Sequence, residues 1–124
     1  INRIDPHILR KAFIKLSATF SKRLTSLYLF LRTGHAPLNL HLHRIQKSNS
    51  PSCPHCPNTD ETVHHYLLAC PHYRKERHLL TTALGRDASS IQFLLSAPEA
   101  TPHLVTYVNA TGRMKAVLGV VPLP

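Results

Sequence analysis

The sequence CPHC at residues 53–56, followed by ETVHHYLLACP at residues 61–71, contains all three cysteines of this 124-residue chain. Two residues separate the first two cysteines, a spacing at which a tight turn brings both thiolates to one side. Four residues separate His65 from the last cysteine, so one helical turn can present both side chains. Four protein ligands close a tetrahedral zinc site, as in structural rather than catalytic sites. The spacing therefore predicts a structural Zn2+ site formed by Cys53, Cys56, His65 and Cys70.

The identity of the histidine ligand stays open at this point. His64 precedes His65 directly, and His55 and His72 lie close by in the sequence. His65 is favoured because it has the four-residue spacing to Cys70, and His64 is the main alternative.

A redox interpretation of the first two cysteines competes with the metal site. A Cys-Pro-His-Cys sequence also suits thiol–disulfide enzymes, in which a helix begins at the first cysteine and lowers its pKa. Here Pro54 and Pro57 bracket a loop, no strand is predicted before it, and a third cysteine follows. These features favour metal binding in a reducing compartment, nuclear or cytoplasmic, over disulfide chemistry.

The net charge of +9 is concentrated in the first part of the chain. Residues 1–50 contain nine Lys and Arg against one acid, whereas residues 51–124 contain six against five. Such an excess adds little to a fold and indicates a polyanionic partner, most commonly a nucleic acid, although a solvated basic face is the simpler alternative. The candidate phosphate-binding residues are Arg10, Lys11, Lys15, Lys22, Arg23, Arg32, Arg44 and Lys47.

Helical periodicity dominates the rest of the sequence and predicts a mainly α fold. Apolar residues at mixed three- and four-residue spacings predict an amphipathic helix over residues 7–20. Leu24, Leu27, Tyr28 and Leu31 form a helical stripe that Gly34 can end. Further helices are predicted from Pro37 to about Ile45, Val63 to Ala69, Pro71 to about Leu84, from Ser89 or Ser90, and from Thr101 through Val108.

This pattern divides the chain into four predicted segments. They are a basic helical segment (1–46), a zinc-binding module (47–85), C-terminal helices (86–114) and an unstructured tail (115–124). No alternating strand pattern is present, and no apolar run is long enough to span a membrane. The polar start gives no sign of a signal peptide, and a first residue other than Met suggests a fragment of a longer product.

Several of these stretches together resemble a known family. They are residues 31–39, 43–44, 53–56, 61–71 and 107–114, and the likeness extends over about residues 24–114. They are similar to the zinc-binding C-terminal region of non-LTR (LINE-like) retrotransposon polyproteins, especially fungal ones. In that family the region follows a reverse transcriptase and an RNase H domain, neither of which is present here.

The resemblance implies a function and a set of partners. It implies that Cys53, Cys56, His65 and Cys70 bind zinc, and that the region holds template RNA or target DNA during retrotransposition. The upstream reverse transcriptase and RNase H domains would then be natural partners. Neither a membrane nor a small-molecule substrate is expected.

Catalysis by this chain alone is not expected. RNase H and polymerase chemistry need clustered carboxylates that hold Mg2+, and no three of the six acids are spaced to form such a site. We expect Glu61 and Thr62 to serve the start of the helix that carries His65. The alternatives to nucleic-acid binding are a zinc-stabilised scaffold that docks through the Leu24–Leu31 stripe on upstream domains or a host protein, and a relic without function.

Overall fold

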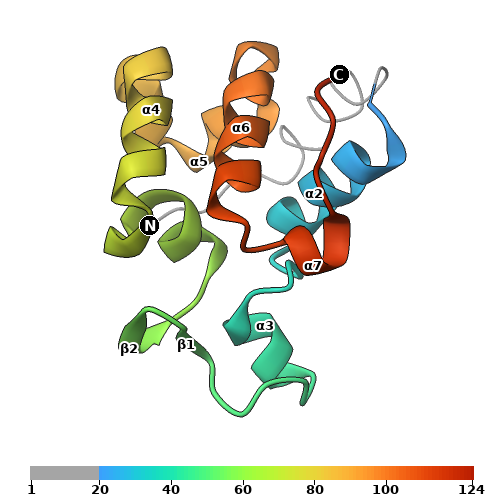
Figure 1. Ribbon diagram of the computed structural model, residues 1–124, viewed down its shortest axis with the longest axis vertical. Coiled ribbons are helices and arrows are strands. Elements are labelled where there is room, and N and C mark those ends of the chain that lie inside the picture. The colour runs from blue at the N-terminus through green and yellow to red at the C-terminus, as the bar shows by residue number, and fades with distance from the viewer. Residues whose placement is uncertain (1–19) are drawn as a thin grey trace.

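The computed structural model describes residues 20–124, and the predicted helix over residues 7–20 lies almost entirely outside this range. The chain is mainly helical, as predicted from the sequence, with one small antiparallel sheet (Figure 1). Its elements are α2 (Lys22–Thr33), α3 (Asn39–Arg44), β1 (Ser52–Cys53), β2 (Cys56–Asp60), the π-helical turn η2 (His65–Ala69), η3 (Pro71–Tyr73), α4 (Arg74–Leu84), η4 (Gly85–Ser89), α5 (Ile91–Ser96), η5 (Pro98–Ala100), α6 (Thr101–Thr111) and α7 (Lys115–Leu118). None of the helices in the described part is long and apolar enough to cross a membrane.

Local signals in the sequence explain where the longer helices begin and end. The Ser21 hydroxyl accepts a hydrogen bond from the backbone N–H of Leu24 and so caps α2. Gly34 ends α2 and Gly112 ends α6, both with a positive φ that glycine adopts without a steric penalty. Ser90 caps α5 by accepting from the N–H of Phe93, in agreement with the sequence.

The core lies between α2, α5 and α6, with α4 packed against the outer side of α6 (Figure 1). The predicted stripe on α2 is buried within this core, so it is not a free docking surface. The predicted zinc-binding segment contributes to the same core, because Tyr66 and Leu67 are fully buried in it. The described parts of the four predicted segments therefore share one core. Its fully buried members include Leu24, Leu27, Tyr28, Tyr66, Leu67, Leu94, Leu95, Leu104 and Tyr107.

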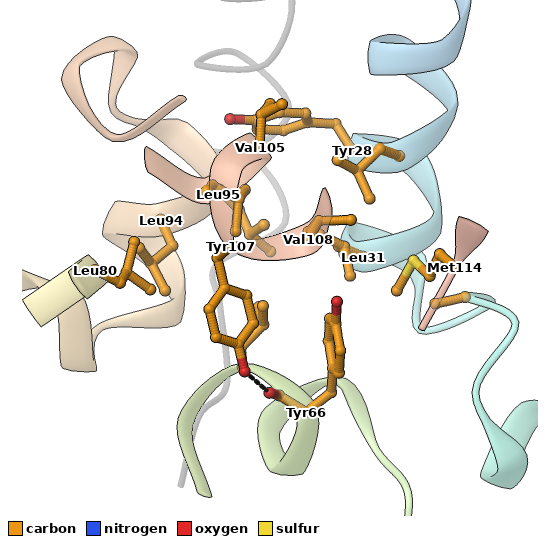
Figure 2. Close-up of a cluster of buried hydrophobic side chains, with 14 of the residues drawn as sticks. Tyr28, Leu31, Tyr66, Leu80, Leu94, Leu95, Val105, Tyr107, Val108 and Met114 are labelled. Carbon is orange, nitrogen blue, oxygen red and sulfur yellow. Dashed lines mark hydrogen bonds between the residues drawn. The ribbon is translucent and has the colours of Figure 1, made fainter. Parts of the chain in front are cut away.

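Three tyrosines satisfy buried polar groups within this core. Tyr28 donates to Thr101 Oγ1 at 3.0 Å, which joins α2 to α6. Tyr107 donates to the carbonyl oxygen of Tyr66 at 2.5 Å (Figure 2), and the hydroxyls of Tyr66 and Thr111 lie 2.6 Å apart. These bonds join the η2 turn to α6, so the predicted zinc-binding segment is fixed to the helical core.

The prediction of an unstructured tail is wrong. Residues 115–118 form α7, and Val121 is buried beyond it. The side chain of Asn109 on α6 makes two hydrogen bonds of 2.9 Å with the backbone of Val121, one to its carbonyl and one from its N–H. A side-chain amide therefore pairs with this segment as a neighbouring strand would, and local sequence patterns do not reveal such a contact.

No strand is predicted from the sequence, yet the structure contains two among residues 20–124. β1 and β2 pair antiparallel, with Cys53 opposite Cys56 and Ser52 opposite Asp60. Strands of two and five residues are too short for an alternating pattern to be recognised. Pro37, predicted to begin the next helix, instead precedes it, since α3 starts at Asn39.

Candidate metal centre

A tight turn at the end of the small sheet positions the first two cysteines. Cys53 ends β1 and Cys56 begins β2, and the two are paired across the ladder with Pro54 and His55 between them. Asn58 in β2 adopts a positive φ, a conformation that asparagine tolerates better than most residues. The loop composition rich in Pro and Asn thus produces a turn that brings two thiols together.

The other two candidate ligands come from one helical turn and its end. Thr62 caps this turn, because its Oγ1 accepts a hydrogen bond of 2.9 Å from the N–H of His65. The N–H of Cys70 donates to the His65 carbonyl at 2.8 Å, which gives the turn its wider π form. Cys70 has extended backbone and Pro71 follows it, so the chain turns away and the thiol returns toward β1.

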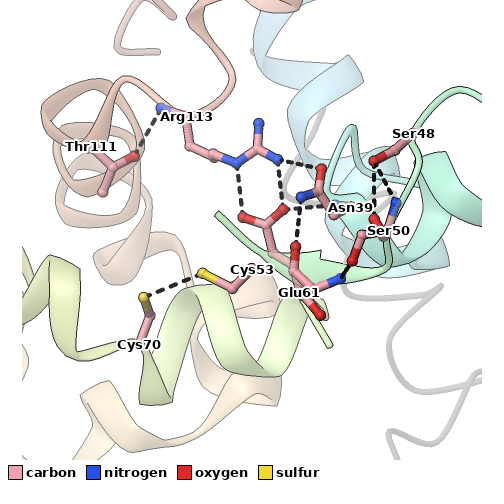
Figure 3. Close-up of polar contacts among 9 residues, drawn as sticks. Asn39, Ser48, Ser50, Cys53, Glu61, Cys70, Thr111 and Arg113 are labelled. Atoms are coloured by element: carbon pink, nitrogen blue, oxygen red, sulfur yellow. Dashed lines mark hydrogen bonds and ion pairs between the residues drawn. The ribbon is translucent and has the colours of Figure 1, made fainter. Parts of the chain in front are cut away.

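The structure brings the four predicted ligands together. The Sγ atom of Cys70 lies 3.8 Å from that of Cys53 and 3.8 Å from that of Cys56 (Figure 3 shows the first pair). All four ligand atoms, including the His65 ring nitrogen, lie within 4.8 Å of one another. The cysteines are not joined by disulfides. Cys53, Cys56, His65 and Cys70 are therefore close enough to hold a metal ion.

One nitrogen of the His65 imidazole lacks a partner among residues 20–124. His65 is buried, and its Nε2 makes no hydrogen bond with any residue from 20 to 124. A buried polar atom without a partner is costly unless a ligand satisfies it, and a metal ion would do so. His64, the alternative ligand, is exposed and does not belong to the cluster.

Burial in the protein alone disfavours the thiolate forms of Cys53 and Cys56. Burial raises the pKa of the Cys53 thiol to about 12, and desolvation also raises the pKa of Cys56. Burial lowers the pKa of His65, which favours the neutral imidazole that metal coordination requires. A bound cation reverses the balance for the thiols because it stabilises their deprotonated form.

Arg77 on α4 supports the last cysteine from outside the cluster. Its Nη2 donates to the carbonyl of Cys70 at 2.5 Å, and its Nη1 donates to the Tyr107 hydroxyl at 3.4 Å. The guanidinium thus connects the group of four candidate ligands to α4 and α6. This role could not be predicted from the sequence, in which Arg77 is only one more cation of a predicted helix.

Glu61 has a different role from the one predicted. Its carboxylate is fully buried and accepts two hydrogen bonds from Arg113, from Nε at 2.8 Å and from Nη2 at 2.6 Å (Figure 3). It also accepts from the backbone N–H of Asn39 at 2.7 Å, while the Asn39 side chain donates to the carbonyl of Ser52. The hydrogen bonds to Glu61 raise the pKa of Arg113. Glu61 therefore joins α3 to the segment after α6, Asn39 joins α3 to β1, and Thr62 alone caps the helical turn.

Of the predicted nucleic-acid contacts among residues 20–124, Arg32 and Arg44 line one groove, whereas Lys22, Arg23 and Lys47 do not. Arg10, Lys11 and Lys15 lie outside the described residues. Lys22 and Arg23 begin α2, about 15 Å along its axis from Arg32. Arg23 also donates to the carbonyl of Val120 at 3.5 Å, so it contacts the tail. Arg44 ends α3, and Lys47 is exposed in the turn after it.

Comparison of the chain with protein families, with curated proteins and with solved structures found no match. The functional interpretation therefore depends on the residues themselves.

Proposed function

We propose that the ion held by this cluster is Zn2+ and that its role is structural. Two thiolates bound tetrahedrally at about 2.3 Å from one zinc ion lie about 3.8 Å apart. The two sulfur separations of 3.8 Å agree with this value. Three sulfurs and one imidazole nitrogen would fill all four positions, so no position remains for a substrate. Zinc bound here would hold the β1–β2 hairpin on the η2 turn.

We further propose that the chain is a nucleic-acid-binding module of a retrotransposon-derived reverse transcriptase and RNase H protein. The observation that carries this proposal is the excess of eight positive charges in residues 1–50, on the chain that leads into the metal cluster. The resemblance of residues 24–114 to the family supports it. The module would assist RNA or target-DNA binding in the nucleus or cytoplasm, together with the upstream domains. It would not catalyse a reaction by itself, because no three of its acids are suitably spaced in the sequence.

The salt dependence of binding tests this function. Fluorescence anisotropy of the zinc-loaded chain with labelled RNA and DNA, between about 50 and 200 mM salt, should show affinity that falls steeply. The expected log–log slope is about −0.7 to −0.9 for each phosphate contact. Absence of binding at the lowest salt, or affinity indifferent to salt, would contradict the proposal.

Matched charge variants locate the contacts. Replacing Lys22, Arg23 and Lys47 by Gln should weaken binding and make the salt slope shallower by about two to three. Replacing Arg74, Lys75 and Arg86 by Gln removes the same charge from exposed positions in the evenly charged part of the chain. That control should change the affinity much less. Equal losses in both variants would indicate attraction to net charge alone.

A scaffold role is the second candidate, and the C-terminal segment favours it. Val117, Val120 and Leu123 are 59–61% exposed, although all three are apolar. They could contact upstream domains of the same polyprotein. Co-purification of the chain with such a fragment, free of nucleic acid, would favour the scaffold over the nucleic-acid module.

A further inference from the structure

An open groove of about 580 Å³ lies beside the metal cluster. Its walls are the C-terminal end of α2 with the turn at Gly34, the helix α3, and the segment Glu61–His64. The groove has the size of sites that bind small organic groups. None of the four candidate metal ligands lines it, so it is separate from the metal centre.

The charged side chains that line this groove are mostly cationic. Arg32 and Arg44 both line it, and Arg44 is exposed and forms no ion pair with any residue from 20 to 124. Partial burial lowers the pKa of Arg32, yet a guanidinium remains protonated at neutral pH. Among residues 20–124, Glu61 is the single acid in the lining, and both its oxygens already accept hydrogen bonds from Arg113. Arg44 therefore offers a positive charge to an anion that enters the groove.

A flat aromatic surface lies in the same groove. The rings of His35 and His41 are stacked, with centroids 4.8 Å apart and an angle of 24° between their planes. His35 is exposed, and Ile45, which also lines the groove, is 47% exposed. Planar and apolar side chains beside arginines are suited to a ligand that combines a phosphate with an aromatic base.

We propose that this groove binds an unpaired nucleotide of single-stranded RNA or DNA. Its phosphate would contact Arg44, and its base would stack on the pair formed by His35 and His41. A base within a duplex is paired and stacked on its neighbours, so it cannot enter the groove. This inference rests on the proposed nucleic-acid function and adds a site and a preference for unpaired strands.

The test compares single-stranded and duplex ligands on the same protein. Anisotropy of the zinc-loaded chain is measured with labelled oligo(U), oligo(dT) and a duplex DNA of equal length. The double variant His35→Ala/His41→Ala should weaken binding of both single strands by about fivefold to 150-fold, the range for one stacked base. Its affinity for the duplex should change less than about twofold. Arg44→Gln should weaken single-strand binding as well.

Control variants separate stacking and charge from misfolding. His41→Phe keeps a flat ring and should retain most of the single-strand affinity. His103→Ala and Arg86→Gln change exposed residues outside the groove and should bind as the unchanged protein does. Zinc content and circular dichroism of every variant should match those of the unchanged chain.

Four results would overturn this assignment. The first is unchanged single-strand affinity in His35→Ala/His41→Ala, and the second is an equal loss of affinity for the duplex in that variant. The third is a loss of single-strand affinity in His41→Phe as large as in the double variant. The fourth is displacement of oligo(U) by an acidic peptide at the concentration at which unlabelled oligo(U) competes. The last result would indicate a general anion site. If binding is salt-sensitive but unchanged in the groove variants, the groove assignment is wrong and the proposed nucleic-acid function still holds. If the chain binds no nucleic acid at all, both are wrong.

Discussion

The hairpin around the metal cluster and the helical core are stabilised in different ways. In the hairpin, every residue from Pro54 to Asp60 is exposed except Cys56, which is half-buried. In the core, Leu24, Leu27 and Leu104 are fully buried between helices. The core can therefore form by burial of apolar surface, whereas the hairpin has almost none to bury. We therefore propose that a bound metal ion stabilises the hairpin as apolar packing stabilises the core.

Metal removal is expected to have the largest effect and to act unequally on the two regions. Zinc binding to a small structural site is worth about 10–16 kcal/mol of apparent free energy. Chelation, or Cys70→Ser, should therefore unfold the hairpin, while α2, α6 and the η2 turn packed against them keep much of their structure. Amide hydrogen exchange should show protection lost in residues 52–60 and largely retained in both helices. Simultaneous loss in both regions would contradict the distinction, and His64→Ala provides the matched control.

Breaking the ion pair between the two regions should have the next largest effect. Arg113→Ala would leave the fully buried carboxylate of Glu61 without its cation, at a cost of about 3–5 kcal/mol. Urea unfolding of the zinc-loaded protein measures this loss. Arg86→Ala, at an exposed position, should cost less than about 0.5 kcal/mol. A loss below about 1 kcal/mol in Arg113→Ala would show that the joint contributes little to stability.

A cavity in the core should destabilise the protein without affecting the metal site. Leu104→Ala removes a fully buried side chain from α6 and should cost about 2–5 kcal/mol. The zinc content of the folded protein should remain unchanged. Leu79→Ala is the matched control, because Leu79 is 65% exposed. Zinc loss in the folded Leu104→Ala protein would show that the two regions are not separable.

Two tyrosine variants examine the contact between η2 and α6 more finely. Tyr107→Phe leaves the buried carbonyl of Tyr66 without its donor and should cost about 1–3 kcal/mol in thermal or urea unfolding. Tyr66→Phe should cost less, since the Thr111 hydroxyl that it leaves behind already donates to the carbonyl of Val108. A larger loss of stability in Tyr66→Phe than in Tyr107→Phe would show that the hydrogen bond between Tyr66 and Thr111 contributes more.

Local features of the fold could be predicted from the sequence because their causes lie within a few residues. The stripe on α2, the glycine after it and the Ser90 cap each depend on neighbours within one or two helical turns. The mainly α fold and the grouping of three cysteines with a histidine follow from periodicity and spacing in the same way.

Contacts between distant residues could not be predicted from this sequence. Glu61 and Arg113 are 52 positions apart, and nothing near either residue identifies the other as its partner. The tail was wrongly predicted because Asn109 holds it through its side chain, which gives no periodic signal. The stacking of His35 on His41 depends on the turn between α2 and α3, so the groove was not foreseen either.

Zinc content per chain tests the central claim most directly. The purified protein should contain one zinc ion per chain by elemental analysis or native mass spectrometry, and His64→Ala should retain it. His65→Ala, Cys53→Ser, Cys56→Ser and Cys70→Ser should each lose it or bind it far more weakly. Stoichiometric zinc that survives in His65→Ala but disappears in His64→Ala would contradict the proposed metal centre.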